Sequence, residues 1–486
     1  MKKVNIIEIG IGPHAKRVYV PAIIKLSQTY NIELSLAIDL KEKEEDVKSY
    51  FSSVSIAPQL LFVDPFDGDL PQDLKKALND FVKVNQIQAV IISTEPRSHY
   101  VYAKWALDQG LNILMDKPIS TRENVVTDID AALGIREEYN DLLKKYVSLQ
   151  KRKQTAFTIN AQRRYHDGFE LVSSLLKEIA SKTNCPVTSI QSMHCDGQWR
   201  LPSEIVTQKY HPYGEGYGKA SHSGYHIFDI AYTFYKSSLI TGKLADSAEV
   251  YSSFIQPNGF LFQLSEADYA RYFGEEYKKV KLYSDKQLKK KYQGFGEMDA
   301  FSNIRFLKQG ENVCNISINL LHNGFARRTW IKPGSDLYKG NGRVKHEYHN
   351  IQQGPFQNIQ IHSYQSNDKH ETSTEQDYEI GGNNHFDIYV FRNFEMTGDD
   401  KPLKIIRMSD LSKKNNYDKS KLVVELTKES VVKEFFDFIY GKIGKDKLRS
   451  NIDDHEIPVN IMSSVYSSHV NQQAKKDPVA RFKLNI

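Results

Sequence analysis

The chain has 486 residues, of which 40% are hydrophobic, and this is enough for two or three globular domains with apolar cores. Its formal net charge of +5, from 65 basic and 60 acidic side chains, is too small at this length to indicate a nucleic-acid partner. The three cysteines are too few and too widely spaced for a disulfide framework, which indicates a reducing compartment. No signal peptide precedes the first strand, and no apolar run reaches the roughly 18 residues that a membrane span needs. We therefore expect a cytoplasmic protein that binds neither nucleic acid nor membrane.

The first part of the chain alternates short apolar runs with helical patterns. Runs typical of buried strands occupy residues 4–9, 34–38, 60–63, 89–93 and 112–115. Apolar residues at helical spacing occupy 74–84 and 99–109, and a long helical pattern rich in Glu and Lys covers 124–150. Strands that alternate with helices predict an α/β domain with a doubly wound parallel sheet and right-handed crossovers.

From residue 155 onward, the predicted strands become longer and the helices rarer. Strands are predicted at residues 157–160, 187–194, 250–254, 302–307, 314–320 and 359–363. Helices are predicted at residues 171–179, 223–235, 431–443 and 458–471. Residues 334–382 are polar and in places without pattern, so we expect an elaborated loop there. This part is therefore expected to be an α+β domain with a mainly antiparallel sheet.

A glycine-rich turn follows the first strand, with the sequence Gly10-Ile11-Gly12-Pro13-His14-Ala15. Gly10 permits a sharp turn, Gly12 lets a pyrophosphate approach the backbone, and Ala15 lets the next helix pack closely on the strand. The helix start offers free N–H groups to phosphates. Asp39 ends the second strand, where a carboxylate would accept hydrogen bonds from the ribose of NAD and repel the 2′-phosphate of NADP. A glycine turn without a nucleotide is the alternative, but the preceding strand and following acid favour an NAD site in a Rossmann domain.

Two further strand ends are expected to lie beside the glycine turn, because ligands of parallel sheets bind beyond the carboxyl ends of the strands. These strand ends are residues 93–99 and 116–118. The predicted cofactor-binding residues are therefore Gly10, Gly12, Pro13, His14, Ala15, Asp39, Ser93, Thr94, Glu95, His99, Asp116 and Lys117. NAD is the expected cofactor, in preference to NADP.

Lys117, His226 and His222 are the candidate catalytic residues. An ammonium at a strand end beside the nicotinamide, as at Lys117, can hold a substrate oxygen and stabilise a developing alkoxide. An imidazole such as His226 exchanges protons near neutral pH, and His222 lies four residues earlier, on the same face of a helix. The alternatives are a surface lysine and a hydrogen-bonded core histidine. The histidine spacing also suits a metal site with Asp229, but no third strong ligand is close in sequence, so we expect no metal.

Sugars favour aromatic platforms and charged hydrogen-bond donors, and six further residues supply such groups. The candidate substrate contacts are Arg163, Arg164, Tyr165, Trp199, Arg200 and Tyr225. The alternative is that several of these side chains only brace the domains.

Four segments, in this order, resemble the Gfo/Idh/MocA family, which includes glucose–fructose oxidoreductase and inositol dehydrogenase. They are the glycine turn, Ser93–His99, Asp116-Lys117-Pro118 and His222–Asp229. Trp199-Arg200 and a final helix that ends Ser463-Ser464-Val465-Tyr466 are also similar. The resemblance covers nearly all of residues 1–235 and roughly the last 60, whereas the middle of the carboxyl half is longer than is usual. His222 stands where the family usually has Asp, so the division of roles between His222 and His226 stays open.

The resemblance implies an NAD(H)-dependent oxidoreductase that transfers hydride between nicotinamide and a sugar, cyclitol or sugar derivative. It implies a Rossmann domain followed by a substrate domain, and the change in pattern near residue 155 places them at residues 1–152, with residues 124–150 as the linking helix, and at residues 153–486. The sheet of that second domain would be open, and its free face would form a homodimer or homotetramer. Two alternatives remain: a non-catalytic dinucleotide-binding regulator or scaffold, and an NAD-assisted lyase or glycoside hydrolase.

Overall fold

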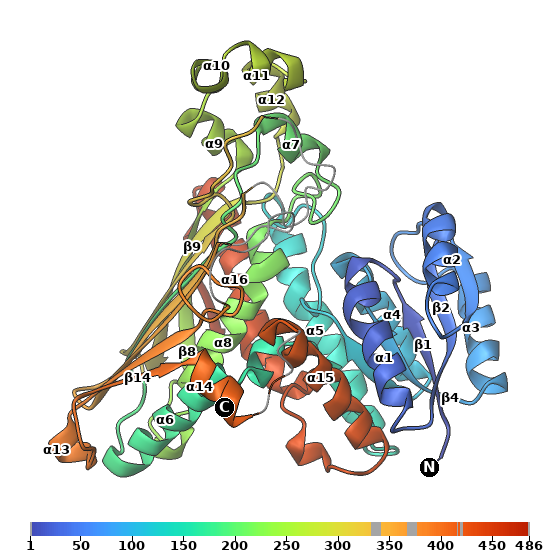
Figure 1. Cartoon of the computed structure of the whole chain (residues 1–486), viewed down its shortest axis with the longest axis horizontal. Coiled ribbons are helices and arrows are strands. Elements are labelled where there is room, and N and C mark those ends of the chain that lie inside the picture. Colours follow the sequence, from blue (N-terminus) through green and yellow to red (C-terminus); the bar gives the residue numbers. More distant parts are fainter. Residues whose placement is uncertain (1, 332–341, 367–376, 416, 418–420, 485–486) are drawn as a thin grey trace. The chain divides into compact units, whose positions relative to one another are not determined.

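The computed structural model of the chain describes residues 2–331, 342–366, 377–415, 417 and 421–484 (Figure 1). The chain divides into two compact units, each assembled from three separate segments. The first unit comprises Met1–Thr121, Ile135–His166 and Val423–Val459, and the second comprises Arg122–Gly134, Asp167–Leu422 and Asn460–Ile486. The sequence had suggested one boundary after residue 152, whereas each unit here takes segments from both sides of it.

The first unit is built on a sheet of six parallel strands in the order β3-β2-β1-β4-β5-β6. The strands are β1 (Val4–Ile9), β2 (Ile32–Leu40), β3 (Gln59–Val63), β4 (Ile87–Ile92), β5 (Asn112–Met115) and β6 (Phe157–Ile159). The order reverses between β1 and β4, which is the point where doubly wound sheets bind ligands. The strand predicted at 157–160 thus belongs to this sheet, and its assignment to the second domain was wrong.

The helices of the first unit include η1 (Ala15–Tyr19), α1 (Val20–Ser27), α2 (Glu44–Ser52), α3 (Gln72–Val84), α4 (His99–Asp108) and α15 (Val423–Ile439), and α5 (Ile129–Gln150) belongs to it from Ile135 onward. The helices predicted at 74–84 and 99–109 are α3 and α4 and lie close to their predicted positions, whereas two other predicted helices differ in their bounds. The helix predicted from residue 124 begins only at Ile129, because Asn124 has the left-handed φ of +60°. The helix predicted at 431–443 begins at Val423 and ends at Ile439.

Helix α15 completes the core of the first unit, although it comes from near the end of the chain. Its Val431, Phe435 and Phe436 are fully buried against strand and helix residues such as Val4 and Ile23. The helix packs on α1, η1 and β5, and it lies beside α1 in Figure 1. Burial of these side chains is the hydrophobic contribution that holds α15 in this unit.

The second unit contains a sheet of nine strands in the order β14-β13-β12-β11-β7-β10-β9-β8-β15. The strands are β7 (Ser189–Cys195), β8 (Ser247–Ile255), β9 (Asp299–Lys308), β10 (Glu311–Leu321), β11 (Lys345–Gln353), β12 (Gln357–Gln365), β13 (Asp387–Arg392), β14 (Leu403–Arg407) and β15 (Ala480–Lys483). All neighbours are antiparallel except β7 and β10, which are parallel. The predicted fold class is therefore confirmed.

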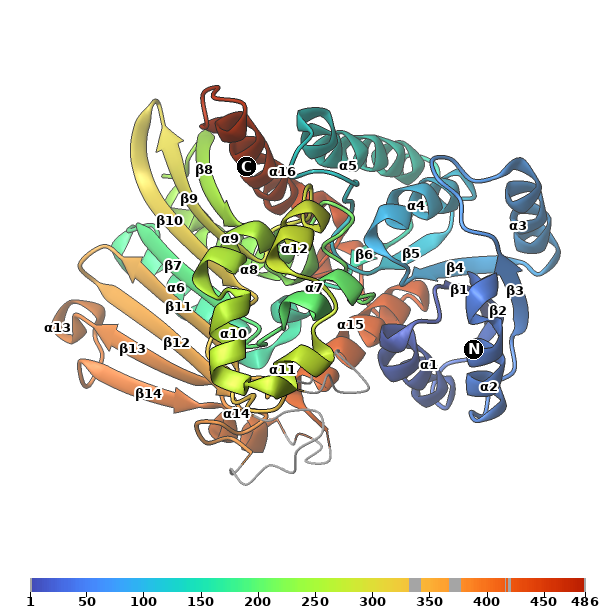
Figure 2. The same cartoon turned by 90° about the horizontal axis from the view of Figure 1, so that it is seen from above.

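The helices α6 (Asp167–Thr183), α8 (Tyr225–Lys236) and α16 (Glu456–Gln473) also lie close to their predicted positions. Both α6 and α8 lie along one face of the nine-stranded sheet (Figure 1). This unit also contains the short helices α7 (Pro202–Thr207), α9 (Pro257–Gln263), α10 (Glu266–Phe273), α11 (Glu275–Val280), α12 (Asp285–Lys291), α13 (Phe394–Thr397) and α14 (Met408–Lys414). Four of them, α9 to α12, form an insertion between β8 and β9 that groups with α7 in Figure 2.

The loop predicted at residues 334–382 was wrong where β11 occupies it, whereas β12 contains the strand predicted at 359–363. Residues 332–341 and 367–376 lie outside the described residues. The period-two pattern escaped detection because the buried face of β11 is itself polar, with Glu347, His349 and Gln353. These buried groups bond one another and their neighbours, as His349 Nδ1 does with Ser192 Oγ at 2.9 Å.

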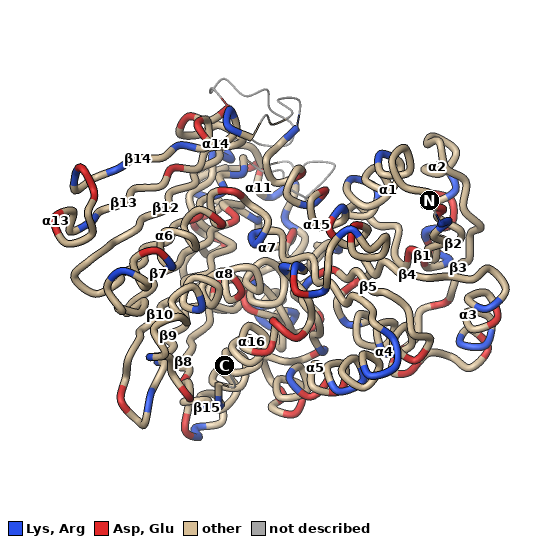
Figure 3. Tube along the Cα trace, turned by 90° about the horizontal axis from the view of Figure 1, so that it is seen from below, with Lys and Arg blue, Asp and Glu red and all other residues tan. Residues whose placement is uncertain are grey.

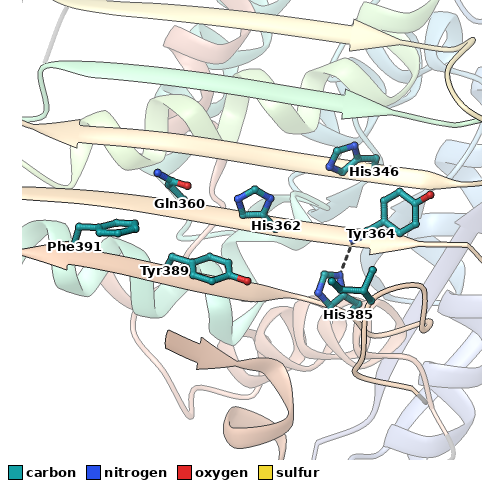
Figure 4. A pocket seen from close by; sticks show the side chains of 8 residues that line it. His346, Gln360, His362, Tyr364, His385, Tyr389 and Phe391 are labelled. Carbon is teal, nitrogen blue, oxygen red and sulfur yellow. Dashed lines mark hydrogen bonds between the residues drawn. The ribbon is translucent and has the colours of Figure 1, made fainter. Parts of the chain in front are cut away.

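The other face of this sheet is open and carries a hollow of about 310 Å³. Its lining residues are His346, Gln360, His362, Tyr364, Ile380, His385, Tyr389 and Phe391 (Figure 4). His385 Nδ1 accepts a hydrogen bond from the backbone N–H of Tyr364 at 2.8 Å, which fixes one wall. Aromatic and imidazole rings thus face outward from three neighbouring strands.

Charged residues of both signs are mixed along the helices and loops of each unit (Figure 3). The lysine-rich run at residues 286–291 lies on α12. Cys185, Cys195 and Cys314 are all free thiols. Among the described helices, none combines the length and apolarity needed to cross a membrane.

Candidate cofactor and active site

The glycine turn fits a dinucleotide phosphate. Gly10 has a φ of +90°, and a Cβ there would come within 2.8 Å of the backbone of Ser93 and Thr94, so only glycine lets the turn approach β4 this closely. The approach is fixed by Ser93 Oγ, which donates a hydrogen bond to Gly10 O at 2.6 Å. A Cβ on Gly12, by contrast, would meet no atom within 4 Å, so the backbone there faces open space. That space is what a pyrophosphate needs in order to reach backbone N–H groups.

Asp39 is held against this turn by both of its carboxylate oxygens. Oδ2 accepts a hydrogen bond from the N–H of Ile11 at 2.8 Å, and Oδ1 accepts one from the N–H of Leu40 at 2.7 Å. The negative charge is therefore fixed beside the end of β1. This is the place from which a carboxylate reaches the ribose of NAD in Rossmann domains.

The helix after the glycine turn begins with a π-helical turn, η1, which the sequence did not reveal. π-helical turns often mark functional sites. Tyr19, the last residue of this turn, is fully buried and donates a hydrogen bond to Asp116 Oδ1. Asn160 Nδ2 donates to the same oxygen at 3.1 Å and to Tyr19 Oη at 2.7 Å, and His14 Nε2 lies 3.8 Å from that oxygen. Tyr19 and Asn160 were not predicted from the sequence, because the three segments that supply this hydrogen-bond network lie far apart along the chain.

The network decides the charge of Asp116. Burial raises the pKa of its carboxyl, but the hydrogen bond from Tyr19 and the neighbouring positive charges, Lys117 among them, outweigh burial, so the pKa of Asp116 lies below its usual value. Burial lowers the pKa of His14 and keeps that imidazole neutral near neutral pH. Asp116 is therefore an ionised carboxylate whose Oδ1 is engaged within the first unit.

His99 clamps the other two strand ends together. Its Nδ1 lies 2.7 Å from Pro118 O, and its Nε2 lies 3.2 Å from Thr94 O. Burial lowers the pKa of His99, so the neutral ring donates one hydrogen bond, and the shorter distance assigns it to Pro118. Glu95 accepts a hydrogen bond from the N–H of Arg97 at 3.1 Å and caps the turn at 96–98. The first unit thus brings the strand ends at 93–99 and 116–118 beside the glycine turn, and Lys117 lies on the last of them.

His222 lies in the second unit on another π-helical turn, η5 (Ala220–Gly224), which leads into α8. Its ring stacks on that of His211 with centroids 4.4 Å apart, and it meets the rings of Tyr213 and Tyr217 edge-on. His226 follows on the first turn of α8, and both histidine side chains are buried. Three aromatic rings therefore fix the plane of the His222 imidazole.

The turn that carries His222 is anchored by Glu297 and Tyr466. Glu297 Oε1 accepts hydrogen bonds from the N–H of Ala220 at 2.7 Å and from the Tyr466 hydroxyl at 3.0 Å. The Tyr466 oxygen accepts a hydrogen bond from the N–H of Ser221 at 3.1 Å. Burial raises the pKa of Glu297 to about 7. The sequence did not reveal these anchors, because Glu297 lies in the loop before β9 and Tyr466 lies on α16, both far from η5 in sequence.

A buried charged cluster lies directly before the same turn. Lys219 Nζ donates a hydrogen bond to Asp196 Oδ2 at 2.5 Å and lies 3.0 Å from His194 Nδ1. Burial lowers the pKa of Lys219. Burial would raise the pKa of Asp196, but Lys219 and His322 outweigh it and hold that pKa well below its usual value. A lysine beside the histidine motif was the only signal in the sequence for this ion pair. Among the described residues, no group of three or more His, Cys, Asp or Glu side chains is arranged to hold a metal ion.

The candidate substrate contacts of the first unit are engaged internally. Arg164 Nη1 donates hydrogen bonds to Asp454 Oδ2 at 2.6 Å and to Arg449 O at 3.0 Å. Tyr165 donates one to Glu434 Oε1 at 2.6 Å, and Arg163 is buried on the same short helix. Arg164 and Tyr165 brace this unit, and their contact with substrate stays a prediction.

The candidate substrate contacts of the second unit are also engaged internally. Trp199 packs on the rings of Tyr269 and Phe273 and donates its indole N–H to Tyr269 Oη at 3.2 Å. Arg200 is buried and donates to Gln198 Oε1 at 3.0 Å, and Tyr225 is a fully buried residue at the start of α8. Trp199 therefore helps to attach the helical insertion, and the substrate role of all three stays a prediction.

The comparisons with known proteins agree on one fold. Residues 5–143 match the GFO_IDH_MocA family model, described as an oxidoreductase family with an NAD-binding Rossmann fold. No curated protein matches the chain. Similar solved structures include an NAD-binding oxidoreductase from Klebsiella pneumoniae, with a TM-score of 0.57, 12% identity and complete coverage of both chains.

Two further solved structures have the same architecture along nearly the whole chain. An oxidoreductase from Agrobacterium radiobacter in complex with NAD+, L-tartaric acid and magnesium has a TM-score of 0.56 and 12% identity, with coverage of 99% of this chain and 98% of that one. An aldose–aldose oxidoreductase from Caulobacter crescentus, complexed with glycerol, has a TM-score of 0.53 and 11% identity, with coverage of 99% and 100%. At such identities the likeness demonstrates a shared fold.

Proposed function

We propose that this chain, whose residues 5–143 match the model of the Gfo/Idh/MocA oxidoreductases with an NAD-binding Rossmann fold, is an NAD(H)-dependent oxidoreductase of a sugar, cyclitol or sugar derivative. The predicted resemblance and the NAD-binding fold are confirmed by that match. The observation that carries the proposal is the glycine turn, which is open at Gly12 and lies beside the fixed carboxylate of Asp39. The substrate class and the residue roles below are our inference.

The cofactor supplies the hydride acceptor or donor when it is bound. The protein's part is to hold it and to stabilise charge on the substrate. The turn at Gly10–Gly12 offers backbone N–H groups to the pyrophosphate, and Asp39 orients the adenosine ribose and selects NAD over NADP. Lys117 follows β5, and the His99–Pro118 hydrogen bond fixes the backbone beside it. We assign to its ammonium the task of donating a hydrogen bond to the substrate oxygen and stabilising alkoxide charge.

His226 is proposed as the group that exchanges the hydroxyl proton. An imidazole can accept that proton during oxidation and return it during reduction near neutral pH. We assign to His222 an orienting role, because its ring is held by the stack with His211 and the edges of Tyr213 and Tyr217. This division accounts for an imidazole at 222, where the family usually has a carboxylate.

Substitution of Lys117 by Ala tests the catalytic assignment. The measurement is absorbance of NADH during turnover of a panel of sugars, cyclitols and sugar derivatives, with NADH affinity measured separately. Loss of a preorganised donor to a developing oxyanion lowers turnover by about 10²–10³-fold. NADH affinity is expected to stay within a few-fold of the unmodified protein. The control is Lys104→Ala on α4, a partly exposed lysine whose Nζ lies 3.6 Å from Asp69. Turnover of Lys117→Ala within tenfold of the unmodified protein would rule out the assigned role.

The presence of His222, where the family usually has Asp, favours one alternative function, a dinucleotide-binding regulator without catalysis. A protein that binds NADH but exchanges no hydride with any member of the panel would establish this alternative. Release of the leaving group from aryl glycosides is measured in parallel, because a lyase or glycoside hydrolase that regenerates its NAD shows no net change in NADH.

We infer further that two or four copies associate through the open face of the nine-stranded sheet. The residues that support this share that face and expose apolar side chains: Phe301 is 39% exposed, Phe391 is 39% exposed and Ile405 is 49% exposed. Sheet faces with such rings usually pack against another layer. Sedimentation velocity is expected to give a dimer or tetramer, and Phe391→Lys a smaller species. A monomer of the unmodified protein at micromolar concentration would refute this inference.

A further inference from the structure

Helix α12, in the helical insertion of the second unit, has one buried side and one lysine-rich side. Leu288 and the Tyr292 that follows the helix are buried in a small core with apolar residues of α9. Three of the lysines are exposed and are spaced by three and four residues, so they lie on one face of the helix. These lysines are Lys286, Lys289 and Lys290.

The three lysines of α12 differ from the lysines of the neighbouring α11 in their ion pairs. On α11, Lys278 pairs with Glu275 at 2.7 Å, and Lys279 pairs with Glu276. Among the described residues, no carboxylate forms an ion pair with any of the three lysines of α12. The carboxylate of α12 itself, on Asp285, accepts a hydrogen bond from a backbone N–H of α10 at 3.1 Å. The positive charge on this face of α12 is therefore not offset by a paired carboxylate.

An exposed aromatic ring lies beside these lysines. Phe262 on α9 is 81% exposed, although Phe260 and Leu261 directly before it are buried. Lys289 Nζ lies over the ring of Phe262, 4.8 Å from its centroid, so the two helices present charge and aromatic surface together. Single exposed apolar side chains are common, but one that adjoins unpaired lysines indicates a surface for a partner with both anionic and apolar parts. We call this surface the basic–aromatic face, formed by Phe262, Lys286, Lys289 and Lys290.

The position and chemistry of this face favour a lipid surface over a nucleic acid. Figure 1 shows α10, α11 and α12 beyond the end of β9, so a flat surface can reach this end of the second unit. Unpaired lysines attract anionic headgroups, and a phenylalanine ring enters the boundary between headgroups and acyl chains. A nucleic-acid base instead stacks on the face of an aromatic ring, and Lys289 covers one face of Phe262.

We propose that the basic–aromatic face binds the surface of membranes that contain anionic phospholipids, with its lysines against the lipid phosphates and the Phe262 ring inserted below the headgroups. Such peripheral binding needs no membrane-spanning helix. It departs from the expectation that the chain binds no membrane, which rested on the lack of a spanning segment and on the small net charge of the whole chain. The proposal is independent of the oxidoreductase function, because no residue of this face belongs to the candidate cofactor and active site.

The test is co-sedimentation of the full chain with vesicles of phosphatidylcholine alone, and with vesicles in which roughly a third of the lipid is phosphatidylserine, at about 0.1 M salt. We expect binding to the anionic vesicles alone. Each lysine near an anionic surface strengthens binding about fivefold, so Lys286→Gln/Lys290→Gln should bind about 25-fold more weakly.

Two further variants complete the test. Phe262→Ser should bind the anionic vesicles at least about threefold more weakly, because the inserted ring is lost. The matched control is Lys278→Gln/Lys279→Gln, which changes the net charge by the same amount within the same insertion but removes lysines that are already paired. It should bind within about threefold of the unmodified protein, since paired lysines contribute little to the attraction.

Three results overturn the proposal. The first is no binding to the phosphatidylserine vesicles, and the second is an equal loss of binding in the two double-lysine variants, which would show that net charge alone is responsible. The third is binding of a single-stranded oligonucleotide that is as tight as vesicle binding, is lost in Lys286→Gln/Lys290→Gln and is unchanged in Phe262→Ser. That result would assign these lysines to a nucleic acid.

Discussion

Replacement of Asp39 by Asn tests the cofactor assignment most directly, because it removes one charge and little volume. In the unmodified protein the carboxylate accepts hydrogen bonds from Ile11 N–H at 2.8 Å and Leu40 N–H at 2.7 Å. The Asn side chain has one acceptor oxygen, so one of these N–H groups would face an amide nitrogen. The turn would lose one of its two anchors, and the ribose would lose its charged acceptor.

The magnitude follows from these two losses. A hydrogen bond to a charged group contributes about 1.5–3 kcal/mol net, and part of this is recovered by water at a partly exposed site. We therefore expect NAD to bind about tenfold more weakly to Asp39→Asn, which corresponds to ~1.4 kcal/mol. Repulsion between one carboxylate and a nearby 2′-phosphate is ~1–4 kcal/mol for charges near a protein surface, and it disappears in the variant. The preference for NAD over NADP should then fall by roughly 10–100-fold.

The assay is fluorescence titration of the protein with NADH and with NADPH at one ionic strength, since the effect is electrostatic. The matched control is Glu33→Gln, which removes one charge from the other end of β2, where the side chain is 52% exposed. It should leave the ratio of the two affinities unchanged. If the unmodified protein binds both cofactors equally, or if both variants alter the ratio to the same extent, Asp39 does not face the ribose.

Two further predictions concern the support of the His222 turn. The pKa of Glu297 is raised from 4.5 to about 7. Between these pH values the folded protein holds a proton that the unfolded chain releases. The free energy of unfolding therefore falls as pH rises, by at most about 3 kcal/mol. Glu297→Gln keeps the acceptor for Ala220 and removes this titration. The free energy of unfolding in urea of the variant, minus that of the unmodified protein, should therefore be larger at pH 8 than at pH 5.5. An equal difference at both pH values would contradict this. Lys219→Met leaves Asp196 buried without its ammonium and should lower the free energy of unfolding by about 3 kcal/mol, most of which Lys219→Met/Asp196→Asn should restore. No recovery in that double variant would show that the ion pair is not the source of the loss.

The strands of the first sheet and the glycine turn could be read from the sequence because their signals are local. A run such as 4–9 is apolar throughout, as strands covered on both faces must be, and Gly10 is the residue type that its φ of +90° requires. Asp39 was equally visible, because a carboxylate at the end of the second strand has a fixed place in such units. These features depend on neighbours along the chain, so the order of residues suffices to predict them.

The assignment of segments to units was not visible in the same way. Residues 157–159 form a sixth parallel strand and Val423–Ile439 completes the core of the first unit, yet both lie beyond the boundary drawn from the change in pattern. A short apolar strand or an amphipathic helix has the same pattern whichever unit it joins. Its partner is decided by which exposed apolar surface it can cover, and this depends on the whole fold.

The sequence by itself determined the fold class, the family resemblance and the NAD-binding turn. The tertiary structure alone decided the polar network around each candidate catalytic group. Tyr19 and Asn160 meet at Asp116, and Glu297 and Tyr466 meet at the His222 turn, although each set comes from segments far apart along the chain. Hydrogen bonds and charge interactions act over a few ångströms in space regardless of separation in sequence, so only folding could bring these groups together.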